Sequence, residues 1–303
     1  MAPAPQELDA LRRRLGPVGV WFAALGRRSA AEERAGAAAI EELGYPALWY
    51  GESQANKEAF AHAAILLDAS ERLTIGAGIA SIYVRDPVAM QTGGLALADA
   101  YDGRFVLGMG VSHAPMVQAR GHDYARPVST MRAYLDAMDA ARYVPPPPAD
   151  GLPRVLAALR QRMLELARDR THGAHPYLTT PRHTARARAV LGVGPVLAPE
   201  QGFVLETDPA RARAVAREHL APYVKLPNYV NSWREEGFED ADVADGGSDR
   251  LVDALVAWGD EAAVAARVRE HLAAGADHVC IQPVRSDVAR ALDELRALAP
   301  AVL

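Results

Sequence analysis

The chain has 303 residues, half of them hydrophobic, and a formal net charge of −5. This charge provides no global attraction to nucleic acid and leaves only a local basic patch open. No stretch reaches the roughly 18 continuous apolar residues of a membrane span, and the N-terminal segment lacks the apolar core of a secretory signal. The single cysteine, Cys280, excludes an internal disulfide framework and clustered thiolate ligands. We therefore expect a cytoplasmic protein whose partners are neither nucleic acid nor membrane.

Short β-like runs alternate with longer helical segments from the N-terminus onward, a pattern typical of parallel βα units. The first three strands are expected at 16–22, 47–52 and 73–81. Ser29 is a candidate N-cap for the helix that follows the first strand, and Gly44 is its candidate stop. Pro87 suits the first turn of the helix that follows the third strand.

The second half continues the alternation with one long interruption. The remaining strands are expected at 104–110, 153–159, 173–179, 195–207 and 276–284. The stretch from Pro209 to Trp258 reads as mostly helical and would be an insertion between strands 7 and 8, a common place for substrate specificity. Eight strands without a break in composition predict an α/β fold, a (β/α)8 TIM barrel in a single domain over residues 1–303. A doubly wound sheet would need fewer strands or a second domain.

Polar side chains recur at the ends of the predicted strands, where a barrel enzyme carries its site. They are Glu52, Ser81, Tyr83, Ser112, His113, Arg160, Gln161, His175 and Tyr177. Each has a structural alternative: Glu52 as a helix cap, His175 as a core histidine, the two tyrosines as packing groups, and Ser112 as a turn residue. The histidines His113, His122, His172, His175 and His183 are too scattered to favour a metal site, and none is expected.

Glycines mark the third and fourth strands. Gly76, Gly78, Gly108 and Gly110 suggest a flat group lying against the backbone of both strands. The run "FVLGMGVSHAP" (105–115) approaches a dinucleotide fingerprint, but His113 stands where its third glycine belongs. The next helix is expected about fifteen residues later, and no acidic residue ends a second strand at the required spacing. A dinucleotide loop is therefore not expected.

Three segments together resemble the bacterial luciferase-like superfamily, and more closely its coenzyme F420-dependent oxidoreductases. They are "LWYGES", "LTIGAGIASIYVRDPVAMQTGGLALADAYDGRFVLGMGVSHAP" and "MLELARDRTHGAHPYLTTPRHTARARAVLG". The resemblance runs from Gly16 to about Leu298. It implies a (β/α)8 barrel with F420 in its mouth, a small-molecule substrate and a homodimer.

The resemblance also implies a cofactor site. A non-prolyl cis peptide bond behind the deazaflavin is expected within residues 78–81, at Gly78–Ile79. The strand 4 motif would contact the cofactor, and a helix N-terminus after strand 5 would hold its phosphate. The residues implied are Gly78, Ile79, Ala80, Ser81, Gly110, Val111, Ser112, Arg160, Gln161, Arg162, Met163, Gly173, Ala174 and His175.

Two departures bear on the reaction. Arg160–Gln161 replaces a Gly-Pro pair that opens the helix after strand 5 in relatives, which adds charge to the phosphate site or alters cofactor choice. Gly51–Glu52 and His113 stand where the sugar-phosphate dehydrogenases of the superfamily have an Asp-His pair and a glutamate. The sugar-phosphate reaction is therefore not expected.

The function predicted is F420-dependent hydride transfer, in either direction, with a side chain moving the proton. His113 is the first candidate because its ordinary pKa lies near neutrality. Glu52 is the second, paired with His113 or His175, and His175 is itself a candidate for catalysis or for cofactor binding. The alternatives are an FMN-dependent luciferase-like monooxygenase and a catalytically silent barrel that binds a flavin-like molecule.

Overall fold

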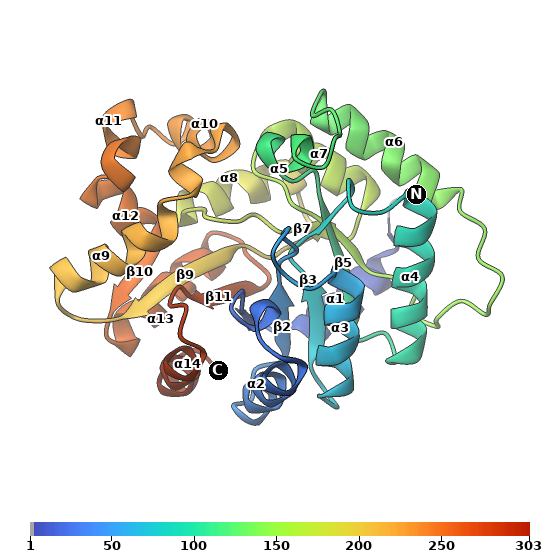
Figure 1. The fold of residues 1–303 in the computed structure, drawn as a ribbon, viewed down its shortest axis with the longest axis horizontal. Coiled ribbons are helices and arrows are strands. Elements are labelled where there is room, and N and C mark those ends of the chain that lie inside the picture. The colour runs from blue at the N-terminus through green and yellow to red at the C-terminus, as the bar shows by residue number, and fades with distance from the viewer. Residues whose placement is uncertain (1–2) are drawn as a thin grey trace.

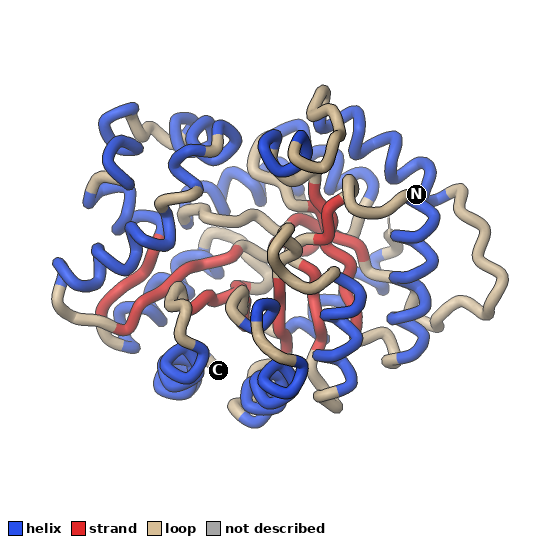
Figure 2. Tube along the Cα trace, in the orientation of Figure 1, coloured by secondary structure: helices blue, strands red, loops and turns tan. Residues whose placement is uncertain are grey.

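Parallel strands and helices alternate through residues 3–303, which the computed structural model describes. The strands form one sheet with helices along its outer side (Figures 1 and 2). They are β1 (Val18–Trp21), β2 (Ala47–Tyr50), β3 (Thr74–Ala77), β4 (Ala80–Ser81), β5 (Phe105–Gly110), β6 (Arg154–Leu156), β7 (Gly173–Ala174), β8 (Val196–Leu197), β9 (Glu200–Leu205), β10 (Val256–Gly259) and β11 (Val279–Pro283). The strand order is β10-β9-β11-β1-β2-β3-β5-β6-β7-β8, with β4 beside β5.

The segment from β8 to β9 closes the sheet into a barrel. On one side the amides of Ala198 and Glu200 donate to carbonyls of Ala174 and Pro176, next to β7. On the other side β9 pairs in parallel with β11, with Cys280 opposite Glu200. This segment is the single strand expected at 195–207, so the predicted (β/α)8 TIM barrel is confirmed.

The helices cover the outside of the barrel and one end of it. They are α1 (Pro5–Leu15), α2 (Ala30–Glu42), α3 (Ala59–Asp68), α4 (Pro87–Ala100), α5 (Ala114–Gln118), α6 (Pro127–Asp139), α7 (Gln161–Arg170), α8 (Pro181–Leu191), α9 (Pro209–Leu220), α10 (Pro227–Glu235), α11 (Asp240–Val243), α12 (Asp249–Leu255), α13 (Glu261–Ala273) and α14 (Val288–Val302), with 3₁₀ turns η1 (Leu25–Arg27), η2 (Tyr223–Lys225) and η3 (Ala244–Gly246). The expected cap is present: the Ser29 hydroxyl accepts from the amide of Glu32.

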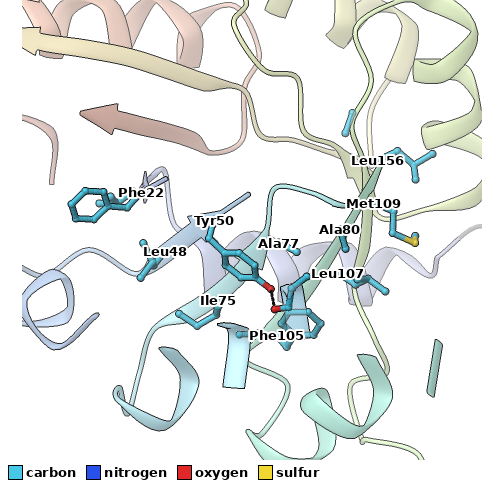
Figure 3. Close-up of a cluster of buried hydrophobic side chains, with 14 of the residues drawn as sticks. Phe22, Leu48, Tyr50, Ile75, Ala77, Ala80, Phe105, Leu107, Met109 and Leu156 are labelled. Carbon is cyan, nitrogen blue, oxygen red and sulfur yellow. Dashed lines mark hydrogen bonds between the residues drawn. The ribbon is translucent and has the colours of Figure 1, made fainter. Parts of the chain in front are cut away.

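Two hydrophobic layers hold the barrel together. Outside it, side chains of β2, β3 and β5 pack toward the helices, as Figure 3 shows for Leu48, Ile75 and Phe105. Inside it, Leu11 and Leu15 of α1 join a cluster of inward-facing strand residues and plug the amino-terminal end. The polar residues at the other end of the strands remain grouped at the mouth.

Three local expectations are corrected, and one helix lies where no element was expected. The expected strand at 73–81 is two strands, β3 and β4, separated by the peptide bond between Gly78 and Ile79, which is cis as expected. The loop after β5 contains the short helix α5, which begins directly after His113. The insertion is not only helical, because Val256–Gly259 pairs with β9 as the additional strand β10. The N-terminal segment forms α1, a helix that was not anticipated.

The insertion after β9 forms a second helical layer beside the barrel (Figure 1). Its elements α9, η2, α10, α11, η3 and α12 enclose their own cluster around Trp233 and Leu251. None of the helices in residues 3–303 combines the length and apolar character that crossing a membrane requires. The single-domain organisation stays a prediction.

Candidate functional site at the barrel mouth

The cis bond between Gly78 and Ile79 lies at the carboxyl end of β3, where a barrel carries its site. A Cβ at Gly78 would lie 2.7 Å from both His175 Nε2 and Trp21 Nε1, so a side chain has no room there. Both nitrogens are buried and have no hydrogen-bond partner among the described residues. The wall beside Gly78 thus presents one donor, Trp21, and one further ring nitrogen, His175.

The glycines of the third and fourth strands accommodate protein groups, and the flat ligand expected against their backbone stays a prediction. A Cβ at Gly76 would lie 2.4 Å from the Trp49 ring, and one at Gly108 would lie 1.8 Å from the Ala77 carbonyl oxygen. At Gly110 a Cβ would lie 2.8 Å from the side chain of Ile79. These three glycines therefore permit the close packing that shapes the bulge between β3 and β4.

His175 is a buried, neutral histidine. Its Nδ1 lies 2.7 Å from the carbonyl oxygen of Ala198, and a carbonyl only accepts, so Nδ1 carries the proton and Nε2 the lone pair. Its ring stacks on Trp49, with centroids 4.8 Å apart. Burial lowers the pKa of His175 to about 4. At neutral pH this residue can accept a hydrogen bond from a ligand.

His113 joins the loop after β5 to the insertion. Its Nδ1 lies 3.2 Å from Oδ1 of Asn228 on α10, and its ring packs against Tyr229 with centroids 5.4 Å apart. Since the amide oxygen accepts, Nδ1 donates and Nε2 holds the lone pair. Burial lowers the pKa of His113, and the Asn228 contact opposes that shift. A partly buried neutral imidazole at the mouth can accept a proton.

Glu52 is held by several partners at once. Its carboxylate forms a buried ion pair with Arg85 and accepts from the amides of Ser81, at 2.8 Å, and Ala59, at 3.1 Å. The bond to Ala59 lies in the first turn of α3, so the helix-cap alternative is part of its role. Within residues 3–303 no hydrogen bond joins Glu52 to His113 or His175. Glu52 therefore holds β4 in place through its bond to the Ser81 amide.

The other residues expected at the cofactor lie in separate parts of the barrel. Ile79, Ala80, Ser81 and Gly110 meet across the β4–β5 pair, with Ser81 opposite Gly110. Val111 packs against the barrel core, and Ser112, at a φ of +55°, occupies the left-handed region. Tyr124 donates to the Ser112 carbonyl at 3.3 Å.

The expected phosphate region divides. Arg160, Gln161 and Arg162 lie exposed at the start of α7, while Met163 is buried beneath them. Gly173 and Ala174 lie instead in the wall strand β7, where a Cβ at Gly173 would lie 2.0 Å from the Val196 carbonyl oxygen. Gly173 therefore meets a packing need of the barrel, and its place at a phosphate stays a prediction.

Several mouth residues had no signal in the sequence. Trp21 and Glu200 read as ordinary strand residues, and Arg85 and Asn228 as loop and insertion residues. Tyr177 was one of the candidates at strand ends, and its hydroxyl donates to Gln282 Oε1 at 2.9 Å. A pattern of polar residues at strand ends could have pointed to Gln282, near the end of β11, but not to Glu200, which begins β9.

Two other features lie outside this site. Residues 3–303 contain no group of three or more histidine, cysteine, aspartate or glutamate side chains that could hold a metal ion. A groove of about 790 Å³ is lined by α1 and by the segments that enter β8 and β11. Because these residues precede their strands, the groove lies at the amino-terminal end of the barrel. There Arg12 and Arg188 are both bonded to Asp277.

Residues 17–278 match the model of a family described as luciferase-like monooxygenase. Among solved structures, an F420-dependent secondary alcohol dehydrogenase in complex with an F420–acetone adduct is similar, with a TM-score of 0.76 at 16% identity over 95% of this chain and 99% of that one. The F420-dependent tetrahydromethanopterin reductase of Methanopyrus kandleri has a TM-score of 0.71 at 17% identity, over 95% of this chain and 100% of that one. The oxygenating constituent of 3,6-diketocamphane monooxygenase from Pseudomonas putida, in complex with FMN, gives 0.69 at 15% identity, covering 95% and 98%.

Proposed function

The chain belongs to the luciferase-like monooxygenase family, and on that premise we propose that it is an oxidoreductase that uses coenzyme F420 and acts on a small organic substrate. The observation that carries the proposal is the pair of buried nitrogens without a hydrogen-bond partner, Trp21 Nε1 and His175 Nε2, beside Gly78. A donor and a lone pair side by side suit a heterocycle whose edge carries both an acceptor and a donor. The two F420-dependent neighbours with TM-scores of 0.76 and 0.71 support this choice of cofactor.

The residues present fit such a group. Backbone at the bulge, together with His175, would hold the ring, and the start of α7 with Arg160 would hold the phosphate, because the first amides of a helix and a guanidinium both attract anions. Gly110, Val111 and Ser112 would line the cofactor on the β5 side. When bound, F420 supplies a deazaflavin that accepts or donates a hydride.

The chain's own contribution to the reaction is proton transfer and enclosure. Nε2 of His113 accepts a proton from the substrate in the oxidative direction and returns it in the other direction. Glu52 keeps β4 in place through Ser81, and so holds the bulge on which the ring would rest. The insertion brings Tyr223 and Tyr229 against Tyr177 and keeps water out of the mouth.

An FMN-dependent monooxygenase is the second candidate, and the similarity to the FMN-bound Pseudomonas putida enzyme favours it. Titration of the purified chain with F420 and with FMN, followed by cofactor fluorescence, separates the two. We expect saturable F420 binding and weak FMN binding. Tight FMN binding without F420 binding overturns the proposal in favour of the second candidate. The expected homodimer is tested by analytical ultracentrifugation of the same sample.

A further inference from the structure

Glu200 is a buried carboxyl group inside the barrel that the proposed reaction does not use. Its side chain is fully buried on β9. The next residue, Gln201, bonds to His271 of the outer helix α13, so strand alternation directs Glu200 to the barrel interior. Oε2 accepts from the amide of Leu178 at 3.0 Å, while Oε1 has no partner among the described residues.

Among residues 3–303, no positively charged group that would stabilise a carboxylate interacts with Glu200. The titratable groups that interact with it are Tyr177 after β7, Tyr223 and Tyr229 of the insertion, and Cys280 of β11. Burial raises the pKa of each of these four groups, so all are uncharged at neutral pH. Burial also raises the pKa of Glu200 itself, to about 8. The side chain is therefore a neutral acid at pH 7.

The bond from Leu178 fixes an unusual turn. Leu178 has a φ of +53°, a left-handed conformation that a branched residue adopts only when its surroundings require it. Its amide is held by Glu200, and its carbonyl accepts from Nε1 of Trp233 on α10, at 3.1 Å. One residue thus links the barrel wall to the insertion.

The same turn sets the position of Tyr177. The Tyr177 ring lies 5.2 Å from the Trp21 ring, centroid to centroid, and therefore beside the wall of the bulge. Its hydroxyl donates to Gln282 on β11 and lies 3.3 Å from the Tyr223 hydroxyl. A shift at Leu178 would move this ring and loosen the insertion together.

We propose that Glu200 is a positioning residue: as a neutral acid it anchors the Leu178 turn, and through that turn it sets Tyr177 and the insertion over the mouth. An ionised Glu200 would keep its bond to the Leu178 amide but leave a charged Oε1 unpaired in a buried site, which is strongly unfavourable. Movement of the insertion away from the mouth would admit water to Oε1 and relieve this cost. Alkaline pH therefore opens the mouth, and the effect on the reaction rests on the proposed function.

Hydrogen–deuterium exchange of the ligand-free protein tests the anchor. Peptides covering residues 223–236 are followed from pH 6.5 to pH 9.5, with correction for intrinsic exchange rates, in the wild type, Glu200→Gln and Glu200→Ala. Peptides from α2 are the internal control. In the wild type the open population should rise with pH by up to tenfold per unit until the pKa of Glu200, about 8, and level off above it. Glu200→Gln, which is permanently neutral and keeps an acceptor for Leu178, should exchange more slowly than the wild type at pH 6.5 and show no rise with pH.

The outcomes separate a titrating anchor from a structural one. Glu200→Ala, which lacks the acceptor for Leu178, should exchange at least threefold faster than Glu200→Gln at every pH; if it does not fold, the wild type and Glu200→Gln still decide. An identical pH dependence in those two proteins overturns the proposal. F420 binding is then measured at pH 9, where Glu200→Gln should bind more tightly than the wild type. Absence of F420 binding in all variants counts against the proposed function, while the exchange data still judge Glu200.

Discussion

Nδ1 of His113 lies 3.2 Å from Oδ1 of Asn228, and this contact connects the loop after β5 to helix α10 of the insertion, 115 residues later in the chain. It fixes the tautomer of the histidine and leaves Nε2 as the atom that can take a proton. The residue proposed for proton transfer is therefore oriented by the segment that covers the mouth.

Replacing His113 should impair the reaction without unfolding the protein. His113→Ala is expected to lower kcat about 100-fold, because general acid–base catalysis contributes at least that factor. Asn228→Asp should raise the pKa of His113 by placing a negative charge beside it, and so move the acidic limb of the kcat profile to higher pH. Steady-state kinetics between pH 5 and 9 measure both. An unchanged kcat in His113→Ala would mean that another group moves the proton.

The ion pair between Glu52 and Arg85 should stabilise the fold only as a pair. Arg85→Met leaves the buried Glu52 carboxylate unpaired and is expected to cost about 3–5 kcal/mol of unfolding free energy, measured by urea denaturation. The double variant Glu52→Gln with Arg85→Met should recover much of that loss. Glu58→Gln is the matched control, because Glu58 pairs with the same arginine from an exposed position and should cost about 1 kcal/mol or less. Equal costs for Arg85→Met and Glu58→Gln would contradict this account.

Gly76 should tolerate a side chain only if Trp49 becomes smaller. In Gly76→Ala the new Cβ would lie 2.4 Å from the indole, so the ring and the His175 stacked on it must shift. We expect a loss of about 1–3 kcal/mol, as for other overpacked cores. Trp49→Leu combined with Gly76→Ala should show a favourable coupling energy in a double-mutant cycle. Additive losses would mean that the two residues do not compete for space.

The stability of the protein should fall steeply in acid. Burial lowers the pKa of seven histidines to about 4 or about 3, namely His62, His172, His175, His183, His219, His271 and His278. Their ordinary pKa is about 6.5, so below pH 6.5 these histidines bind protons in the unfolded chain but not in the folded chain. Each histidine changes the unfolding free energy by up to about 1.4 kcal/mol per pH unit. This stabilisation is fully present above pH 6.5 and is lost as the pH falls toward 4. Unfolding free energies at pH 7, 6 and 5.5 test this, and His62→Gln should reduce the slope by about one proton.

Charge at the start of α7 should govern cofactor affinity. Arg160→Glu is expected to weaken F420 binding about tenfold at low salt, with a smaller effect at high salt, because it repels the phosphate. Arg168→Glu, at the exposed last turn of the same helix, makes the same charge change and should leave the affinity unchanged. A loss of equal size in both variants would point to overall charge instead of a local phosphate site.

Much of the barrel could be predicted from local sequence. Alternating apolar runs, the Ser29 cap and the proline at the start of α4 are short-range signals, and the strand order follows from closing eight such units. The cis bond at Gly78–Ile79 was predicted from resemblance. The strand β10 was not, because Val256–Gly259 is short and becomes a strand only through pairing with β9.

The site was less predictable, because its contacts join distant segments. Glu52 was expected to pair with a histidine, but in the structure it forms an ion pair with Arg85, 33 residues away in the chain. Glu200 carried no signal, since one acidic residue in an apolar strand does not show which side chain will lie across from it. The glycines indicated close approach correctly, but whether a ligand or Trp49 fills the space depends on packing.

The amino-acid sequence by itself therefore determined the order of strands and helices and which residues lie at strand ends, because periodicity and capping act over a few residues. Only the tertiary structure decided which ionisable groups are paired, neutral or oriented. Those properties depend on burial and on neighbours far away in the chain, such as Asn228 for His113 and Leu178 for Glu200. The chemistry of the mouth is set by these long-range contacts.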